Sequence, residues 1–266
     1  MNEICRQFDR IEEYARILKG VAEAEILADP SLGGRLTVAR EGTLEVLYAP
    51  FDYVNEQARI VLVGITPGRQ QARNALLEFR RQLVRGVSVK EAARAAKQFA
   101  SFSGPMRSNL VAMLDYFGIS KVLGIASCSE LFASRGDLVH FTSALRYPVY
   151  VAGQNYNGSP PMTTTPVLRE LLFGGFGQEV LRLRSAIFVP LGQKVADALL
   201  MLAESGAVDR SRVLDGLQHP SGANTERIAY LLGRKPRAAL SVKTRPEPID
   251  QARAQLRARV AEWIRA

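Results

Sequence analysis

Two short loops that lie far apart in the chain constrain its fold most strongly. The first, Gly-Ile-Thr-Pro-Gly at residues 64–68, directly follows the apolar run 60–63. The second, His-Pro-Ser-Gly-Ala-Asn at residues 219–224, follows the run 213–217. Each pattern indicates a buried strand that leads into a tight loop and then a helix. In a parallel α/β sheet, such loops lie at the carboxyl ends of the strands and face one crevice, where ligands bind.

The rest of the chain repeats this alternation of short apolar runs and amphipathic segments. We expect strands at residues 60–63, 139–145, 186–189 and 213–217, and helices at residues 70–84, 89–100, 106–117, 166–183, 193–203 and 224–232. The glycine pair 174–175 is a potential break in the fourth helix, and Asn224 is the expected cap of the last one. Residues 147–161 are rich in Gly, Asn, Pro and Tyr and predict a long loop. The alternation predicts a three-layer α/β/α sandwich with a mostly parallel central sheet.

The segments on either side of this body are expected to be appendages. Residues 1–58 predict a cap formed by an amphipathic helix, which runs from about Ile4 to Asp29, and a hairpin of residues 36–38 and 44–48. Residues 59–233 form the main domain, and residues 234–266 are a basic linker followed by a helix at 249–264. For that helix we favour a charged, solvent-facing surface over a DNA-contacting tail.

Composition limits the class of protein. The 266 residues include 35 Lys and Arg against 26 Asp and Glu, a formal net charge of +9. A basic surface favours polyanions such as nucleic acids, although arginine-rich proteins also carry such charge for solubility. Cys5 and Cys128 are the only cysteines and have no CxxC spacing, so we expect no zinc or iron–sulfur site and a cytoplasmic location. No apolar run approaches the roughly 18 residues of a membrane span, and no signal peptide is expected.

Four motifs in order resemble the uracil-DNA glycosylase superfamily. Residues 64–68 are similar to its first motif, and residues 219–221 are similar to the start of its second. Between them, residues 141–146 resemble the strand that carries the base-recognising residue, and residues 187–192 resemble a strand and glycine turn before a helix. The resemblance covers about residues 59–232. One group of that superfamily holds an iron–sulfur cluster with four cysteines, so this chain resembles a divergent member without them.

The resemblance implies hydrolysis of the N-glycosidic bond of a deaminated base, uracil or a related one, that has left the DNA stack. Neither a metal nor another cofactor is implied. His219 matches the histidine that stabilises the departing base anion; the alternative is a structural hydrogen bond. His140 has no motif around it and is expected to be structural. Thr66 stands where relatives have Asp, Glu or Asn; its hydroxyl can position a water but is no base at neutral pH, which implies slow or altered chemistry. The alternative is that Thr66 only caps a turn.

The remaining site residues are expected to bind the substrate. Phe102 corresponds to the residue that stacks on the flipped base, with a plain core role as the alternative. Ser143 lies where several relatives have an asparagine, which puts strict selectivity for uracil in doubt. Ser221 is expected to hold a DNA phosphate. The expected substrate-binding residues are Gly64, Ile65, Pro67, Gly68, Phe102, Ser143, Ser221 and Asn224.

These residues favour a DNA glycosylase of base-excision repair whose partner is single- or double-stranded DNA. Two alternatives stay open. One is a catalytically weak or inactive nucleic-acid-binding protein of the same fold, which Thr66 and the small, polar residues 222–224 favour because no bulky wedge follows the second motif. The other is an enzyme that acts on free nucleotides or nucleosides. The sequence does not indicate the oligomeric state.

Overall fold

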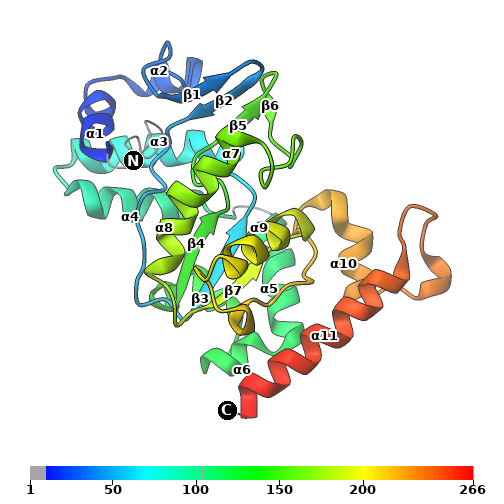
Figure 1. The fold of residues 1–266 in the computed structure, drawn as a ribbon. Helices are drawn as coiled ribbons and strands as arrows, with labels where there is room; N and C mark the ends of the chain where they lie inside the picture. The colour runs from blue at the N-terminus through cyan, green and yellow to red at the C-terminus, as the bar shows by residue number, and fades with distance from the viewer. Residues whose placement is uncertain (1–9, 103–104, 266) are drawn as a thin grey trace.

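A parallel sheet lies at the centre of the computed structural model, which describes residues 10–102 and 105–265. Its three strands are β3 (Ile60–Gly64), β4 (Val139–Ser143) and β7 (Ile187–Pro190), in the order β4–β3–β7 (Figure 1). Strand β3 is paired on both edges, and all its residues are buried. The expected strands at 60–63 and 186–189 are confirmed, and so is the one at 139–145, although β4 ends at Ser143. The fold is of the mixed α/β class.

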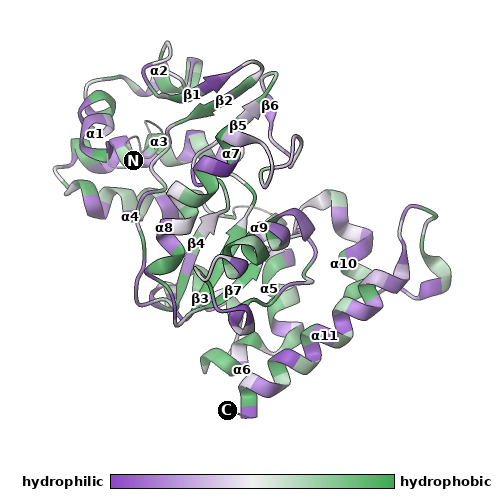
Figure 2. Cartoon of the chain, in the orientation of Figure 1, coloured by the Kyte–Doolittle hydropathy of each residue, from purple (hydrophilic) through white to green (hydrophobic). Residues whose placement is uncertain are grey.

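Helices cover both faces of this sheet because successive side chains of a strand point to opposite faces. Val61 and Val63 belong to one hydrophobic core, whereas Ile60 and Leu62 belong to another. The first core is completed by α1 (Ile11–Lys19), α2 (Glu23–Ala28), α3 (Arg69–Val84), α4 (Val89–Ala100), α7 (Pro166–Leu171), α8 (Gln178–Leu181) and α9 (Gln193–Glu204). The second is completed by α5 (Pro105–Phe117), α6 (Ile119–Leu123), α10 (Thr225–Leu231) and α11 (Pro246–Arg265). Figure 2 shows the hydrophobic strands β3 and β7 and the many hydrophilic residues of α11.

A second, antiparallel sheet joins the N-terminal hairpin to the middle of the chain. Its strands are β1 (Thr37–Glu41), β2 (Leu44–Leu47), β5 (Val149–Val151) and β6 (Gln154–Asn155), in that order. The expected hairpin is confirmed. The prediction of a long loop at 147–161 is wrong, because this segment contains β5 and β6. Ala152 and Gly153 both have positive φ, 47° and 73°, between the paired residues Val151 and Gln154. Two such residues form the turn that suits a two-residue hairpin, so the segment folds back on itself.

Two further expectations about the second motif are wrong. Residues 213–217 do not form a strand; only Val213 bridges to Phe188, in parallel, beyond β7. The chain then leaves the sheet, since Gly216 adopts a φ of +110° that extended strands do not use. Asn224 precedes α10 but its side chain makes no cap hydrogen bond. Its amide instead donates to the carbonyl of His219 at 3.1 Å.

The helical segments otherwise follow the expectations, with local differences. The glycine pair 174–175 lies in a π-helical turn, Leu172–Gly177, that continues α7 into α8 rather than breaking it. The prediction of one long N-terminal helix is wrong, because α1 ends at Lys19 and α2 is a separate helix. Ile4 and Phe8, which we expected in that helix, lie outside the described residues. The predicted domain boundaries at residues 58 and 233 stay predictions.

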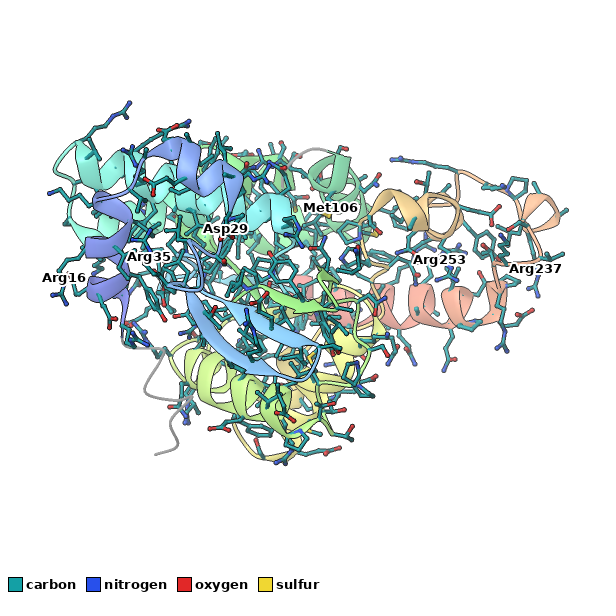
Figure 3. All side chains as sticks on the ribbon, turned by 90° about the horizontal axis from the view of Figure 1, so that it is seen from above. Arg16, Asp29, Arg35, Met106, Arg237 and Arg253 are labelled. Atoms are coloured by element: carbon teal, nitrogen blue, oxygen red, sulfur yellow. The ribbon has the colours of Figure 1, made fainter. Side chains whose placement is uncertain are left out.

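The C-terminal segment extends away from the main body. Helix α11 buries Ile249, Leu256 and Val260 against the second core. The segment between α10 and α11 projects outward, and Figure 3 labels Arg237 towards its end and Arg253 nearer the body. Within the described residues, no helix is both long and apolar enough to cross a membrane.

Candidate functional site

A narrow cavity opens at the carboxyl ends of β3 and β4, as the sheet geometry predicts. Residues from the first motif, the 141–146 segment and His219 line it together with Met106 of α5. Figure 3 labels Met106. Seven of the ten expected site residues line it, namely Gly64, Ile65, Thr66, Pro67, Phe102, Ser143 and His219. The cavity holds about 40 Å³, which admits the edge of an aromatic ring but not a whole ring unless the walls move.

A wider groove of about 540 Å³ adjoins this cavity. Ile65 and His219 line both spaces and therefore stand at their boundary. Asn224 lines the groove, together with the cationic side chains of Lys194 and Arg227. The pair of spaces thus combines a narrow, mostly apolar slot with an open, positively charged surface.

Two expected residues, Gly68 and Ser221, line neither space. Gly68 caps α3, and its N–H donates to Gln71 Oε1 at 3.0 Å. The next N–H, of Arg69, donates to Asn155 Oδ1 at 3.0 Å, which fixes the 155–157 segment against the first loop. Ser221 instead uses its backbone N–H to hold His219.

His219 is oriented by its own loop. Its Nδ1 accepts the N–H of Ser221 at 3.3 Å, so in the neutral ring the proton lies on Nε2. Burial lowers the pKa of this histidine, which keeps it neutral at pH 7. An uncharged Nε2–H donor at the boundary of the cavity is therefore the form that meets a ligand.

The hydroxyl of Thr66 is occupied by the neighbouring backbone. It donates to the carbonyl of Tyr147 at 2.8 Å and accepts the N–H of Val149 at 3.1 Å. These bonds tie the first loop to the start of β5, which corresponds to the structural alternative for this residue. Because a hydroxyl has one proton and two lone pairs, only one lone pair is left for a water.

Close backbone approach shapes the site at two glycines. A Cβ on Gly64 would lie 3.4 Å from Ser143 Oγ and 3.8 Å from the Phe102 ring. A Cβ on Gly192, whose φ is +98°, would lie 3.5 Å from the Cβ of His219. Phe102 itself has a φ of +47°, an unusual conformation for a non-glycine residue. Such strain clusters at binding sites, where surrounding structure holds it.

Comparison with known proteins gives one informative match. The chain is 31% identical over 235 residues to "Uncharacterized protein YoxB" of Bacillus subtilis (strain 168). The aligned region covers 87% of this chain and 90% of YoxB. The chain belongs to the YoxB family. No family model matches it, and no solved structure matches it either. The YoxB relationship therefore assigns the chain to a family and does not by itself assign a reaction.

Beneath the cavity, this YoxB-family chain carries a buried charged cluster that sequence reasoning missed. His140 Nε2 bonds Glu179 Oε1 at 2.6 Å, and Arg146 Nε donates to Glu179 Oε2 at 3.1 Å. Lys97 Nζ donates to the carbonyls of Phe51 and Tyr53 at 3.0 and 2.7 Å. Arg146 also lines the cavity, so the cluster supports its floor.

The electrostatics of the cluster follow from burial and pairing. Burial lowers the pKa of His140 to about 4 and that of Lys97 to about 8. For Glu179, burial alone would raise the pKa, but Lys97, His140 and Arg146 together hold it well below its usual range. His140 accepts the N–H of Asn55 on Nδ1 at 3.3 Å. It is therefore a neutral structural histidine, in line with the expectation.

A weak signal for this cluster exists in the sequence. Lys97 falls on the apolar face of its helix, in line with Ala93, Ala96 and Ala100. A charge on such a face needs a buried partner. The Lys97 ammonium bonds the carbonyls of Phe51 and Tyr53, and Glu179 is a nearby opposite charge. These groups come from distant segments, and no local pattern marks them. Among the described residues, no group of three or more His, Cys, Asp or Glu side chains is placed to hold a metal ion.

Proposed function

We propose that the chain is a DNA glycosylase with the three-layer α/β/α architecture of the uracil-DNA glycosylase superfamily. Its substrate is a deaminated base flipped out of DNA, and its reaction is hydrolysis of the N-glycosidic bond in base-excision repair. The observation that carries the proposal is His219, a neutral Nε2–H donor at the boundary between a narrow, mostly apolar cavity and a cationic groove.

Each part of the site supports one step. The edge of the base enters the cavity, whose walls include the apolar side chains of Phe102 and Phe141. As the glycosidic bond breaks, negative charge develops on the base, and the His219 Nε2–H stabilises it by a hydrogen bond. Lys194 and Arg227 in the groove attract the phosphates on either side of the flipped nucleotide.

The attacking water is the weakest part of this site. Thr66 has its proton in a bond to Tyr147, so it offers the water one acceptor lone pair and no basic group. A dissociative reaction, in which the base departs before water attacks, tolerates this. We therefore expect slow excision.

The test is excision from labelled single- and double-stranded oligonucleotides that contain uracil, hypoxanthine, xanthine or no lesion. The parent protein is compared with His219→Ala and Thr66→Asp. The proposal is supported if the parent excises the base, seen as strand cleavage after alkali, and His219→Ala excises it at least 100-fold more slowly. Removal of such an electrostatic contact usually has an effect of this size. Equal rates in the parent and His219→Ala would refute the role of His219. The thermal unfolding of both proteins is the control for folding.

One observation favours a second candidate, a nucleic-acid-binding protein of the same fold without catalysis. The Thr66 hydroxyl forms hydrogen bonds with the backbone of Tyr147 and Val149, so no basic group activates the attacking water. Binding of uracil-containing oligonucleotides without product, with product restored in Thr66→Asp, identifies this candidate.

A further inference from the structure

Three arginines of the C-terminal helix bond to the protein itself. Arg253 Nε donates to the carbonyl of Leu231 at 2.9 Å. Arg257 Nη2 donates to the hydroxyl of Tyr116 at 2.6 Å, and Arg259 Nη1 donates to a backbone carbonyl at 2.8 Å. These bonds hold α11 on the body of the protein, so the three guanidinium groups stabilise its packing.

The projecting segment, residues 232–245 between α10 and α11, differs in this respect. It contains five cationic residues and no acidic one. Two of the five pair with carboxylates of the flanking helices. The side chains of Arg234, Lys243 and Arg245 are exposed and make no hydrogen bond or ion pair within the described residues. The segment therefore presents three unpaired positive charges to a partner.

One carboxylate at the base of the segment holds it in place. Glu226 of α10 accepts from Lys235 Nζ at 2.7 Å, and from the N–H and the hydroxyl of Ser241 at 3.1 and 2.6 Å. It also accepts from the hydroxyl of Thr244. Val242, which lies between these partners, is fully exposed. Polar bonds to α10 thus order the segment while its outer side chains stay in solvent.

We propose that the projecting segment binds the phosphate backbone of double-stranded DNA through Arg234, Lys243 and Arg245. This inference rests on the proposed function for its partner, and it adds a contact outside the cavity and the groove. Three exposed cations without a carboxylate among them favour a polyanion. An ordered segment suits a duplex, whose phosphates lie at a regular spacing. The segment contains no aromatic residue for the base stacking that holds single strands.

The segment and the groove share the same two helices. Arg227 of α10 and Pro248 of α11 line the groove, and the segment continues outward from these helices (Figure 1). Lys243 is five residues from Pro248, so their Cα atoms are at most roughly 18 Å apart. Phosphates of one strand repeat every roughly 3.4 Å along a duplex. The segment therefore reaches the backbone within roughly five base pairs of the groove.

A membrane surface fits the segment less well. Cations beside an exposed apolar side chain also occur where proteins bind anionic lipids. Within the described residues of this segment, however, Val242 is the only large apolar side chain that is exposed. Stable attachment to lipid requires an apolar helix face or an acyl chain, and a single valine supplies neither.

The test uses the triple variant Arg234→Gln, Lys243→Gln and Arg245→Gln. Its Tm should equal that of the parent, because exposed side chains without partners contribute little to stability. Its affinity for an undamaged duplex should fall at least about tenfold at about 0.1 M salt. The slope of log Kd against log salt should become shallower by about 2–3. Affinity for the single strand of the same sequence should fall several-fold less.

The matched control is the triple variant Lys19→Gln, Arg85→Gln and Lys90→Gln. These side chains are also exposed and make no hydrogen bond or ion pair in the described part of the chain. They lie in or next to α1 and α4, and Figure 3 shows Arg16 of α1 at the opposite end of the molecule from Arg237. The control removes the same net charge, so its duplex affinity and salt slope should stay close to those of the parent.

Three results overturn the inference. They are unchanged duplex affinity in the segment variant, an equal loss of affinity in the control variant, and binding of phosphatidylserine vesicles by a parent that does not bind duplex. Duplex binding that depends on the segment, combined with no excision of any lesion, would leave the inference standing and remove only the glycosylase proposal. Excision from sub-saturating duplex at the same rate in the parent and the segment variant would remove only the inference.

Discussion

Acidification from pH 7 to pH 5 should destabilise this protein through His140. The histidine is 1% exposed and bonded to Glu179, and burial lowers its pKa to about 4 from an ordinary value of 6.5. Below pH 6.5 the unfolded chain takes up a proton that the folded chain does not. Stability therefore falls as the pH drops from 6.5 to 4 and then levels off for this group.

The expected magnitude follows from the two pKa values. The full difference of 2.5 units corresponds to about 3 kcal/mol, and the part lost between pH 7 and pH 5 is about 2 kcal/mol. Other members of the cluster contribute little in this window. Glu179 has a lowered pKa, so its contribution is lost mainly below pH 4.5. Lys97, with a pKa of about 8, changes its contribution only above pH 8.

The assay is urea unfolding at pH 7 and at pH 5 of the parent, His140→Gln and His219→Ala. The chain has only two histidines, so these variants separate their contributions. His140→Gln is expected to be less stable at both pH values but to lose much less between them. His219→Ala should keep most of the parent's loss, since His219 is only partly buried. The reasoning is refuted if His140→Gln and the parent lose the same free energy of unfolding on acidification.

Two further predictions concern structural bonds. Thr66→Val should lower the free energy of unfolding by about 1–3 kcal/mol, because a buried backbone carbonyl and N–H lose their partner, whereas Thr66→Ser should stay close to the parent in urea unfolding. Glu226→Gln should speed trypsin cleavage at Lys243, because the Glu226 carboxylate holds Lys235, Ser241 and Thr244 of the projecting segment. Identical cleavage of parent and variant would show that these bonds do not order the segment.

Local patterns predicted the parts of the fold that depend on local periodicity. The sequence predicted β3 from a continuous apolar run at 60–63 and α4 from an amphipathic pattern at 89–100. Both patterns are readable from neighbouring residues, because they reflect which faces of the element are buried. The hairpin at β5 and β6 was missed because it depends on a positive φ at Ala152, a residue that rarely adopts it. At 213–217, a short segment with three apolar residues has the local pattern of a strand, although only Val213 pairs with the sheet.

The candidate site was predictable where motifs mark it and hidden where side chains from distant segments meet. The loops at 64–68 and 219–221 do converge, because both follow segments that run parallel in the sheet. The sequence did not indicate that Thr66 bonds the backbone at 147–149, because that contact depends on how β5 returns to the first loop. Likewise, the sequence does not indicate that Thr142 Oγ1 is buried without a partner among the described residues, because burial is a property of the folded chain.

The antiparallel sheet has a consequence for how the chain folds during synthesis. Strand β2 pairs with β5, and roughly 107 residues separate Leu44 from its partner Val151. At a translation rate of about 5–20 residues per second, Val151 is made some 5–20 s after Leu44. During that interval the β1–β2 hairpin presents an open, mostly apolar strand edge, the kind of surface through which nascent chains aggregate. Slow emergence of residues 48–148 from the ribosome should therefore be the stage at which this protein depends most on chaperones.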